Sequence, residues 1–315
     1  MIPSTAHPFR GVYAATLTPF RANGSLDEDV LADHFRQVTA EPGIVGVLCN
    51  GHAGESFLLS RQERRRVTEI AAQTVGQTHI VVSGVLCEAS SEAAQHGADA
   101  VEAGADAVLV FPPFSWALSQ DERMAVVHHQ NVAAAAQVPL MLYQAGVSSA
   151  MAYPPEVLSE LVRLPSVVGI KEGSWESCAY DRNRRLVKAV APHVEMMASG
   201  DEHLLSCFAL GSDGSLVSLA AIMPAEIVAL DRAVQAGDLV RARTLHDRIQ
   251  PLANIIYGLA PSGHATARLK ACLGLLGRWP NVAPREPITE MSELELTALR
   301  TGLATAGLLE AVADD

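Results

Sequence analysis

The chain of 315 residues is 49% hydrophobic, 18% charged and 5% aromatic, with a mean hydropathy of +0.18. This composition is typical of a folded globular protein with a sizeable core, and it excludes a disordered or low-complexity chain. The formal net charge of −12, from 35 acidic and 23 basic residues, argues against nucleic-acid binding, which depends on clustered lysine and arginine.

Short apolar runs alternate with segments of helical periodicity along most of the chain. This alternation is the signature of a parallel sheet built from βα units. Eight consecutive units, with strands apolar enough to be buried on both faces, favour closure into a (β/α)8 TIM barrel. The expected strands begin at Gly11, Ile44, His79, Asp106, Pro139, Val167, Val194 and Gly214.

Two of the intervening helices carry a capping pattern at their expected start. In each, a serine is followed three residues later by a glutamate, so that the two residues can satisfy each other's free backbone N–H groups. The pairs are Ser60 with Glu63 and Ser119 with Glu122.

A glycine-containing turn, GHAGES at residues 51–56, directly follows the second expected strand. Gly51 and Gly54 permit a tight turn whose backbone N–H groups, including that of Ala53, can converge on a carboxylate. His52 is a candidate for proton transfer, although an isolated loop histidine is more often simply solvated. Gly-rich turns are common, so this feature alone is weakly specific.

The strongest basic cluster is Arg64, Arg65 and Arg66, in the helical segment after that turn. Helical spacing places Arg64, Arg65 and neighbouring acids on the outward side of an amphipathic helix. We therefore interpret the cluster as a solvated face rather than a binding site.

Lys171 lies at the end of the sixth expected strand, VVGIKEG, and is one of only three lysines against twenty arginines. In a barrel of this type the reacting residues lie at the C-terminal ends of the strands. An ammonium group placed there is partly desolvated, which lowers its pKa and favours the neutral amine that attacks a carbonyl carbon. The alternative is a strand-end lysine that reaches water or pairs with Glu172.

Tyr143 ends the fifth expected strand, PLMLYQ, at the same rim of the barrel. A phenol beside a lysine can move the protons that carbinolamine formation and dehydration require. A lone strand tyrosine is more often a core residue, but its position on the strand next to that of Lys171 favours the catalytic interpretation.

The barrel is expected to end near Ala236, which predicts a catalytic barrel domain at residues 1–236 and a C-terminal helical extension at residues 237–315. Within the extension, the Gly- and Pro-containing segments between the helices are expected to connect them rather than to carry chemistry. The helices are expected around residues 238–257, 265–276 and 292–313, and the connections at 258–264 and 278–287.

Five cysteines without C-x-x-C spacing are expected to be buried free thiols. The N-terminal residues lack the pattern of a secretion signal, so we expect a reducing cytoplasmic location. The longest stretch free of Asp, Glu, Lys and Arg, residues 124–155, contains histidines, amides and prolines and is not a membrane span. No metal-binding or nucleotide-binding motif occurs in a suitable context, so we expect no cofactor.

The ordered set of motifs resembles the dihydrodipicolinate synthase / N-acetylneuraminate lyase family of Schiff-base aldolases over nearly the whole chain. The resemblance implies a (β/α)8 barrel with a C-terminal helical extension and assembly as a homotetramer or homodimer. It assigns imine formation with a 2-oxo acid to Lys171 and proton relay to Tyr143, and it places Ala15, Gly200 and Leu216 at pocket-lining positions. The motifs are ATLTPF (15–20), GHAGES (51–56), GADAVLVFPP (104–113), LY (142–143), GIKE (169–172) and SGD (199–201).

The chain departs from the family pattern at several site positions. The family turn usually carries two hydroxyl residues where this chain has His52 and Ala53, and the aromatic hydroxyl that completes the relay in dihydrodipicolinate synthases corresponds to Phe114. Those synthases also carry an arginine after the fifth strand, for which Ser148 is the nearest match. Lysine-biosynthetic activity is therefore not expected.

These observations lead to a class I lyase or aldolase in which Lys171 forms an imine with pyruvate or a related 2-oxo acid, Tyr143 transfers protons and His52 is a second acid/base. The GHAGES turn would hold the carboxylate. Two alternatives stay open at this point: a 2-keto-3-deoxy sugar acid dehydratase with the same imine chemistry, and a protein that binds small oxo acids without turnover.

Overall fold

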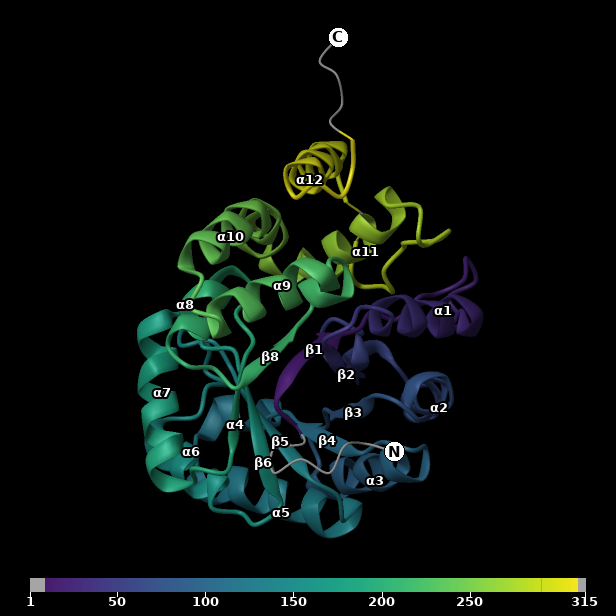
Figure 1. Ribbon diagram of the computed structural model, residues 1–315. Coiled ribbons are helices and arrows are strands. Elements are labelled where there is room, and N and C mark those ends of the chain that lie inside the picture. Colours follow the sequence, from purple (N-terminus) through teal and green to yellow (C-terminus); the bar gives the residue numbers. More distant parts are fainter. Residues whose placement is uncertain (1–8, 290, 311–315) are drawn as a thin grey trace.

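Eight parallel strands form a closed barrel in which each strand pairs with the next and β8 pairs with β1 (Figure 1). The structure, a computed structural model, describes residues 9–289 and 291–310. All eight predicted strands and the TIM-barrel fold are confirmed. The strands are β1 (Gly11–Ala15), β2 (Ile44–Cys49), β3 (Ile80–Val85), β4 (Ala107–Val110), β5 (Leu140–Gln144), β6 (Val167–Glu172), β7 (Glu195–Ala198) and β8 (Gly214–Val217).

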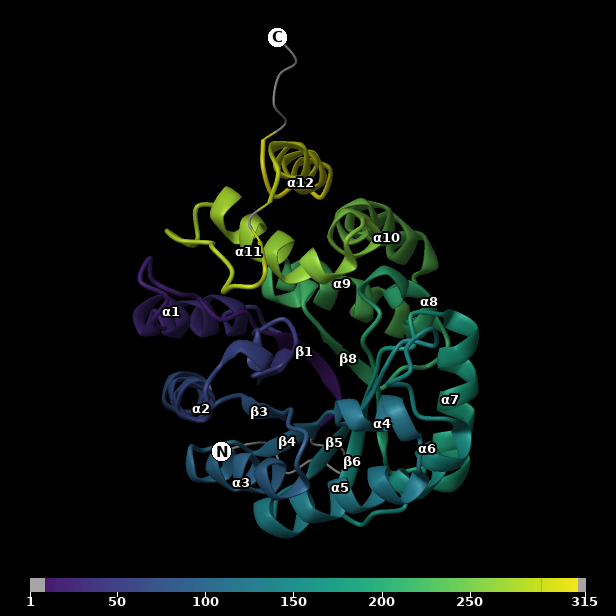
Figure 2. The same cartoon turned by 180° about the vertical axis from the view of Figure 1, so that it is seen from behind.

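Helices surround the barrel, and three more helices lie on one side of it, where α10 packs against α9 and α12 packs on α10 and α11 (Figures 1 and 2). None of the helices in the described residues is long and apolar enough to cross a membrane. The helices are α1 (Glu28–Thr39), α2 (Arg61–Val75), α3 (Ser90–Glu102), α4 (Phe114–Ser119), α5 (Glu122–Ala136), α6 (Pro155–Val162), α7 (Ser177–Val190), α8 (Leu204–Ala209), α9 (Pro224–Gln235), α10 (Leu239–Ala253), α11 (Ala265–Leu275) and α12 (Glu293–Thr305). Short helical turns are η1 (Ser56–Leu58), η2 (Asp201–His203), η3 (Leu219–Ala221), η4 (Asn254–Gly258, a π-helix) and η5 (Ser262–His264).

Of the two predicted capping boxes, one is confirmed and the other is wrong. Ser60 caps α2 in a reciprocal pair with Glu63. Ser119 instead ends α4, and Asp121 caps α5 by accepting a hydrogen bond from the Arg123 N–H at 3.0 Å. An additional short helix, α4, occupies the segment before α5, so the cap of α5 lies two residues later than the pattern predicts.

The basic cluster on α2 is a solvated, ion-paired face for two of its three arginines. Arg65 and Arg66 both pair with Glu69, at 3.1 and 3.2 Å, as expected for such a face. Arg64 departs from the prediction, because its guanidinium donates inward to the carbonyl oxygens of Leu59, at 3.1 Å, and Leu86, at 3.0 Å.

All five cysteines are free thiols, as expected, but not all are buried. Cys49, Cys207 and Cys272 are buried, Cys87 is half-buried and Cys178 is exposed. Cys178 lies in the first turn of α7, on its outward side, which explains the exception. A cytoplasmic location stays a prediction.

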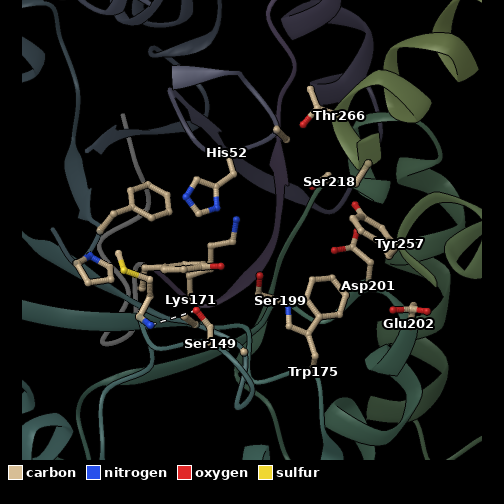
Figure 3. A pocket seen from close by; sticks show the side chains of 18 of the residues that line it. His52, Ser149, Lys171, Trp175, Ser199, Asp201, Glu202, Ser218, Tyr257 and Thr266 are labelled. Atoms are coloured by element: carbon tan, nitrogen blue, oxygen red, sulfur yellow. Dashed lines mark hydrogen bonds between the residues drawn. The ribbon is translucent and has the colours of Figure 1, made fainter. Parts of the chain in front are cut away.

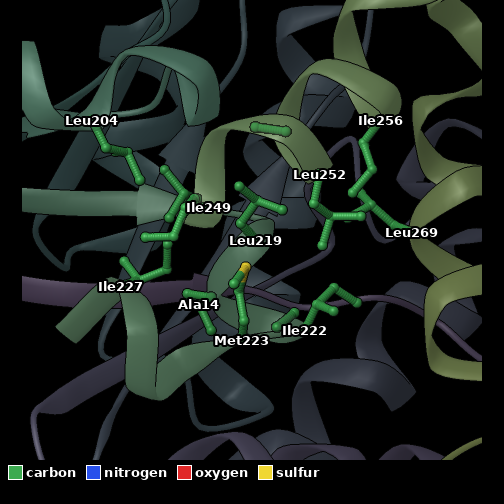
Figure 4. Packing of buried hydrophobic residues seen from close by; sticks show 14 of the residues in the cluster. Ala14, Leu204, Leu219, Ile222, Met223, Ile227, Ile249, Leu252, Ile256 and Leu269 are labelled. Carbon is green, nitrogen blue, oxygen red and sulfur yellow. The ribbon is translucent and has the colours of Figure 1, made fainter. Parts of the chain in front are cut away.

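The C-terminal helices share a continuous hydrophobic cluster with the barrel. Ala14 of β1 and Val217 of β8 belong to the same cluster as Ile249 of α10 and Leu269 of α11. Figure 4 shows Ala14, Met223 and Ile227 facing Ile249 and Leu252 across this contact. The extension is therefore held against the barrel by apolar burial, at the place where η4 and α11 reach the C-terminal ends of the strands.

Candidate active site

A cavity of about 620 Å³ opens at the C-terminal ends of the strands, and it contains the predicted lysine (Figure 3). Its walls come from the segments that follow the strands and from the C-terminal extension. The lining residues are His52, Ala53, Leu86, Phe111, Pro112, Tyr143, Ala145, Gly146, Ser148, Ser149, Met151, Lys171, Trp175, Ser199, Asp201, Glu202, Ser218, Tyr257, Ala265, Thr266 and Leu269.

Lys171 points from β6 into this cavity. Because side chains alternate along a strand, Glu172 points the other way, where it accepts hydrogen bonds from Asn183 at 2.7 Å and from the Ser174 hydroxyl at 3.0 Å. The alternative in which Lys171 pairs with Glu172 or reaches open water is therefore wrong. Lys171 is only 7% exposed, and burial lowers the pKa of its ammonium from 10.5 to about 8, although the nearby Asp201 carboxylate favours the charged form.

Tyr143 stands beside Lys171, because the two residues are register partners on the paired strands β5 and β6. The Lys171 Nζ lies 5.8 Å from the centre of the Tyr143 ring. Burial raises the pKa of the Tyr143 phenol to about 12, so the hydroxyl keeps its proton at neutral pH and can donate it. The geometry that the pairing of the fifth and sixth strands predicts is present.

His52 extends from the GHAGES turn over the same part of the cavity. Its ring stacks on Phe111, with centroids 4.5 Å apart, and meets the Tyr143 ring edge-on at 5.2 Å. His52 is exposed where it faces the cavity, although the rings of Phe111 and Tyr143 pack against its imidazole. Burial, with a smaller contribution from the Lys171 charge, lowers the pKa of His52 from 6.5 to about 4. At neutral pH the imidazole is thus uncharged and can accept a proton rather than donate one from an imidazolium.

The turn leaves two of its backbone N–H groups without an acceptor among the described residues. The N–H groups of Gly54 and Ser56 both donate to the Gly51 carbonyl, at 3.1 and 3.3 Å. The N–H groups of His52 and Ala53, by contrast, find no acceptor within the described residues, and Ala53 lines the cavity. Two free amides beside an amine suit the carboxylate of a 2-oxo acid.

A polar wall faces His52 from the other side of Lys171 (Figure 3). Asp201, at the start of η2, is buried and accepts a hydrogen bond from the Leu219 N–H at 2.8 Å. Burial raises the pKa of Asp201 from 3.8 to about 6. Tyr257 of η4 and Trp175, which follows β6, cover this wall with rings 5.2 Å apart.

The other predicted binding residues lie around the cavity rather than in its lining. Ala15 and Leu216 belong to the closed apolar interior of the barrel, together with Met197. Gly51 contributes the carbonyl that closes the turn, and Gly200 precedes Asp201 without lining the cavity itself.

Sequence reasoning did not identify Asp201, Trp175, Ser218, Tyr257 or Thr266 as site residues. Asp201 had a signal, because the SGD motif that contains it directly follows the seventh strand, at the end of the barrel where reacting residues gather. Tyr257 and Thr266 come from the extension, one in η4 and one in α11, and nothing in the local sequence marks them. None of the described side chains within residues 258–264 lines the cavity, and the expectation that this segment only connects helices stays a prediction.

The departures noted in the sequence are visible in the site. Phe114 begins α4, is 63% exposed and does not line the cavity. Ser148 does line it, and the described residues that line the cavity include no arginine.

One group of possible metal ligands lies outside this cavity, at Cys87, Glu92 and His96. The Arg64 guanidinium already occupies the group: its Nη1 is 2.7 Å from His96 Nδ1 and 3.5 Å from Cys87 Sγ. A bound cation would be repelled by this charge, so the cluster is a poor metal site.

Comparison with known proteins agrees with the fold. The model of the dihydrodipicolinate synthetase family matches residues 8–306. The chain belongs to this family. Members of the family are lyases and aldolases that act through a lysine Schiff base, and the chain is an enzyme of this class.

Among its relatives is a 4-hydroxy-tetrahydrodipicolinate synthase of Methanothrix thermoacetophila, 31% identical over 297 residues, covering 91% of this chain and 98% of the relative. An uncharacterized DapA-like lyase of Halobacterium salinarum is also 31% identical, over 314 residues and 98% of each chain. A solved dihydrodipicolinate synthetase-like structure from Pseudomonas aeruginosa superposes with a TM-score of 0.86 at 26% identity, covering 95% of this chain and 99% of the other. YagE, a prophage protein of this family from E. coli K12 solved in complex with pyruvate, superposes with a TM-score of 0.88 at 24% identity over 96% of this chain and 99% of YagE.

Proposed function

We propose that the protein is a lyase in which Lys171 forms a Schiff base with pyruvate or a related 2-oxo acid, for cleavage or formation of a carbon–carbon bond. The observation that carries this proposal is the Lys171 amine, which lines a cavity beside the Tyr143 phenol and has no salt-bridge partner among the described residues. The pyruvate complex of YagE supports the choice of 2-oxo acid.

The reaction begins when the neutral Lys171 amine attacks the carbonyl carbon of the 2-oxo acid. Tyr143 donates a proton to the carbonyl oxygen, which becomes the hydroxyl of a carbinolamine, and then helps it to leave as water. The resulting protonated imine then accepts the electron pair of the bond that breaks between the carbon attached to the imine carbon and the following carbon, and it becomes a neutral enamine. No further cofactor is required for this step, and the uncharged His52 imidazole is placed to accept a proton during bond cleavage.

The charges in the cavity favour a substrate with a single carboxylate. The free amides of the turn suit that carboxylate, whereas Asp201 and Glu202 on the opposite wall would repel a second one, with no arginine among the described lining residues to bind it. Ser199, Ser218 and Thr266 suit hydroxyl groups on the rest of the substrate. We therefore propose a 2-oxo acid with a hydroxylated, uncharged remainder rather than the substrates of lysine biosynthesis.

A panel of 2-oxo acids, assayed for pyruvate release, tests this function. Borohydride reduction in the presence of pyruvate should leave a stable adduct on Lys171, located by peptide mass spectrometry. Water loss from a 2-keto-3-deoxy sugar acid without carbon–carbon cleavage would indicate the dehydratase instead. Binding of oxo acids without any adduct would indicate a binding protein and would refute the enzymatic proposal.

The pKa of Lys171 predicts how adduct formation depends on pH. Since only the neutral amine attacks and its pKa is about 8, the initial trapping rate should rise steeply, about tenfold per pH unit, below pH 8 and level off above it. Stopped-time borohydride trapping between pH 6 and 9.5 measures this profile. A midpoint near pH 10.5, the ordinary value for a lysine, would contradict the desolvated environment.

The resemblance to the family also leads us to propose assembly as a homotetramer or homodimer. Phe114 and Leu118 of α4 expose apolar side chains that a second copy would cover.

A further inference from the structure

A buried ion pair joins the C-terminal extension to the GHAGES turn. Lys270 of α11 and Glu55 of the turn are in contact, and both side chains are fully buried, with 0% exposure each. The Lys270 ammonium also lies over the Phe20 ring, 4.2 Å from its centre, and the Arg285 guanidinium lies 4.3 Å from the same centre. Among the described residues, Glu55 is the acidic residue that pairs with Lys270.

Glu55 is held from several directions. Its backbone is in the left-handed region, with φ at 54°, which a glutamate adopts only when its surroundings require it. The second carboxylate oxygen accepts the Arg285 backbone N–H at 2.9 Å, and the Glu55 N–H donates to the His52 carbonyl at 3.0 Å. The next carbonyl back, that of Gly54, accepts the Thr18 hydroxyl at 2.8 Å. Any displacement of Glu55 would therefore displace His52 and Ala53.

The two partners come from two segments that both line the cavity, although neither partner lines it itself. The turn contributes His52 and Ala53 to the lining, whereas α11 contributes Thr266 and Leu269, the latter next to Lys270. The ion pair thus sets the separation between the wall that would hold the carboxylate and the wall that would contact the rest of the substrate.

Stability alone is a poor explanation for this arrangement. Desolvation of two buried charges cancels most of their attraction, so an apolar pair of the same volume would hold α11 against the barrel at least as well. A charged pair differs from an apolar one in being directional, because only one relative placement of the turn and the helix satisfies both groups.

We infer that Glu55 and Lys270 are positioning residues, which act through the turn and make the C-terminal extension part of the active site. They hold the free amides of His52 and Ala53 at the position where the carboxylate of the 2-oxo acid binds. This inference rests on the proposed imine chemistry, because the bound carboxylate is that of the imine-forming acid.

Borohydride trapping at increasing pyruvate concentrations tests the inference, because it separates binding from the reaction at Lys171. The variants are Lys270→Met, Glu55→Gln and the double variant, with Arg248→Met as a matched control. Arg248 is also a cation of the extension, but it donates at 2.8 Å to the Ala306 carbonyl, within the extension itself. Thermal unfolding is measured for every variant.

Each single variant should raise the half-saturating pyruvate concentration by roughly tenfold or more, since a misplaced turn weakens the hold on the carboxylate, while the trapping rate at saturation changes little. Each should also unfold at lower temperature, because the remaining charge is buried without its partner. The double variant should recover most of the stability but keep the raised half-saturating concentration. Arg248→Met should leave that concentration as in the unmodified protein.

The outcomes distinguish this inference from the proposed function. If the unmodified protein forms no adduct, the proposed function fails. If it forms the adduct and the single variants are half-saturated at the same pyruvate concentration, only the positioning role is overturned. Recovery of both stability and binding in the double variant would likewise assign the pair a purely structural role. Should the single variants not fold, the double variant, which contains no unpaired buried charge, still decides the question.

Discussion

Lys171→Arg is expected to abolish adduct formation with pyruvate and to reduce turnover to background, a loss of about 10⁴-fold or more. Arginine keeps the positive charge near Asp201, so the fold should be retained, but its guanidinium stays protonated and cannot attack a carbonyl carbon. Intact-protein mass spectrometry after borohydride reduction measures the loss directly, and circular dichroism checks the fold.

Lys188→Arg is the matched control for this experiment. Lys188 lies outside the cavity lining, on α7, and pairs with Asp213 at 2.7 Å. The Lys188→Arg variant should form the adduct as the unmodified protein does. A borohydride-stable adduct that persists in the Lys171→Arg variant would place the reactive amine elsewhere and refute the mechanism.

Tyr143→Phe is expected to lower kcat by about 10²- to 10⁴-fold, the usual contribution of a positioned proton-transfer group. The substitution removes only the hydroxyl, and the ring can still pack at 4.8 Å from Phe111 and 5.2 Å from His52. Lys171 and the turn are unchanged, so we expect a smaller effect on KM than on kcat. Steady-state kinetics with the best substrate of the oxo-acid panel, together with trapping rates, separate the two.

Tyr153→Phe provides the comparison for Tyr143. Tyr153 is also a ring-packed tyrosine: it is buried, packs on Trp116 at 5.2 Å, and its hydroxyl has no hydrogen-bond partner among the described residues. Removal of that hydroxyl should change neither kcat nor the trapping rate. Trapping of pyruvate by Tyr143→Phe as fast as by Tyr153→Phe would show that the phenol of Tyr143 moves no essential proton.

Local sequence rules predict elements well and their ends less well. All eight strands are correctly predicted, because a parallel strand that is buried on both faces is apolar over most of its length. The predicted cap at Ser119 is wrong because α4 is too short for a helical periodicity to be recognised in its sequence. The inward orientation of the Arg64 side chain is also missed. Its acceptors, the carbonyl oxygens of Leu59 and Leu86, lie outside the helix, and helical spacing carries no information about them.

The proximity of Tyr143 and Lys171 is predictable for a geometric reason. Tyr143 and Lys171 end consecutive strands, and parallel pairing brings such positions together at one edge of the sheet. The direction of each side chain also follows from alternation, once the apolar neighbours of Lys171 place it in the interior. The shift in its pKa has no such local origin, because it results from the burial that the finished cavity imposes.

Periodicity and residue type are thus sufficient to predict the barrel, the position of Lys171 beside Tyr143 and the glycine-containing turn. Each of these features depends on neighbours along one strand or on the next strand. The polar wall of Asp201 and Tyr257, the uncharged state of His52 and the contact between Lys270 and Glu55 appear only in the folded chain. They depend on side chains that are far apart in the chain and meet only when the barrel closes and the extension packs on it. No local sequence pattern predicts these contacts, because burial and charge pairing are properties of the assembled core.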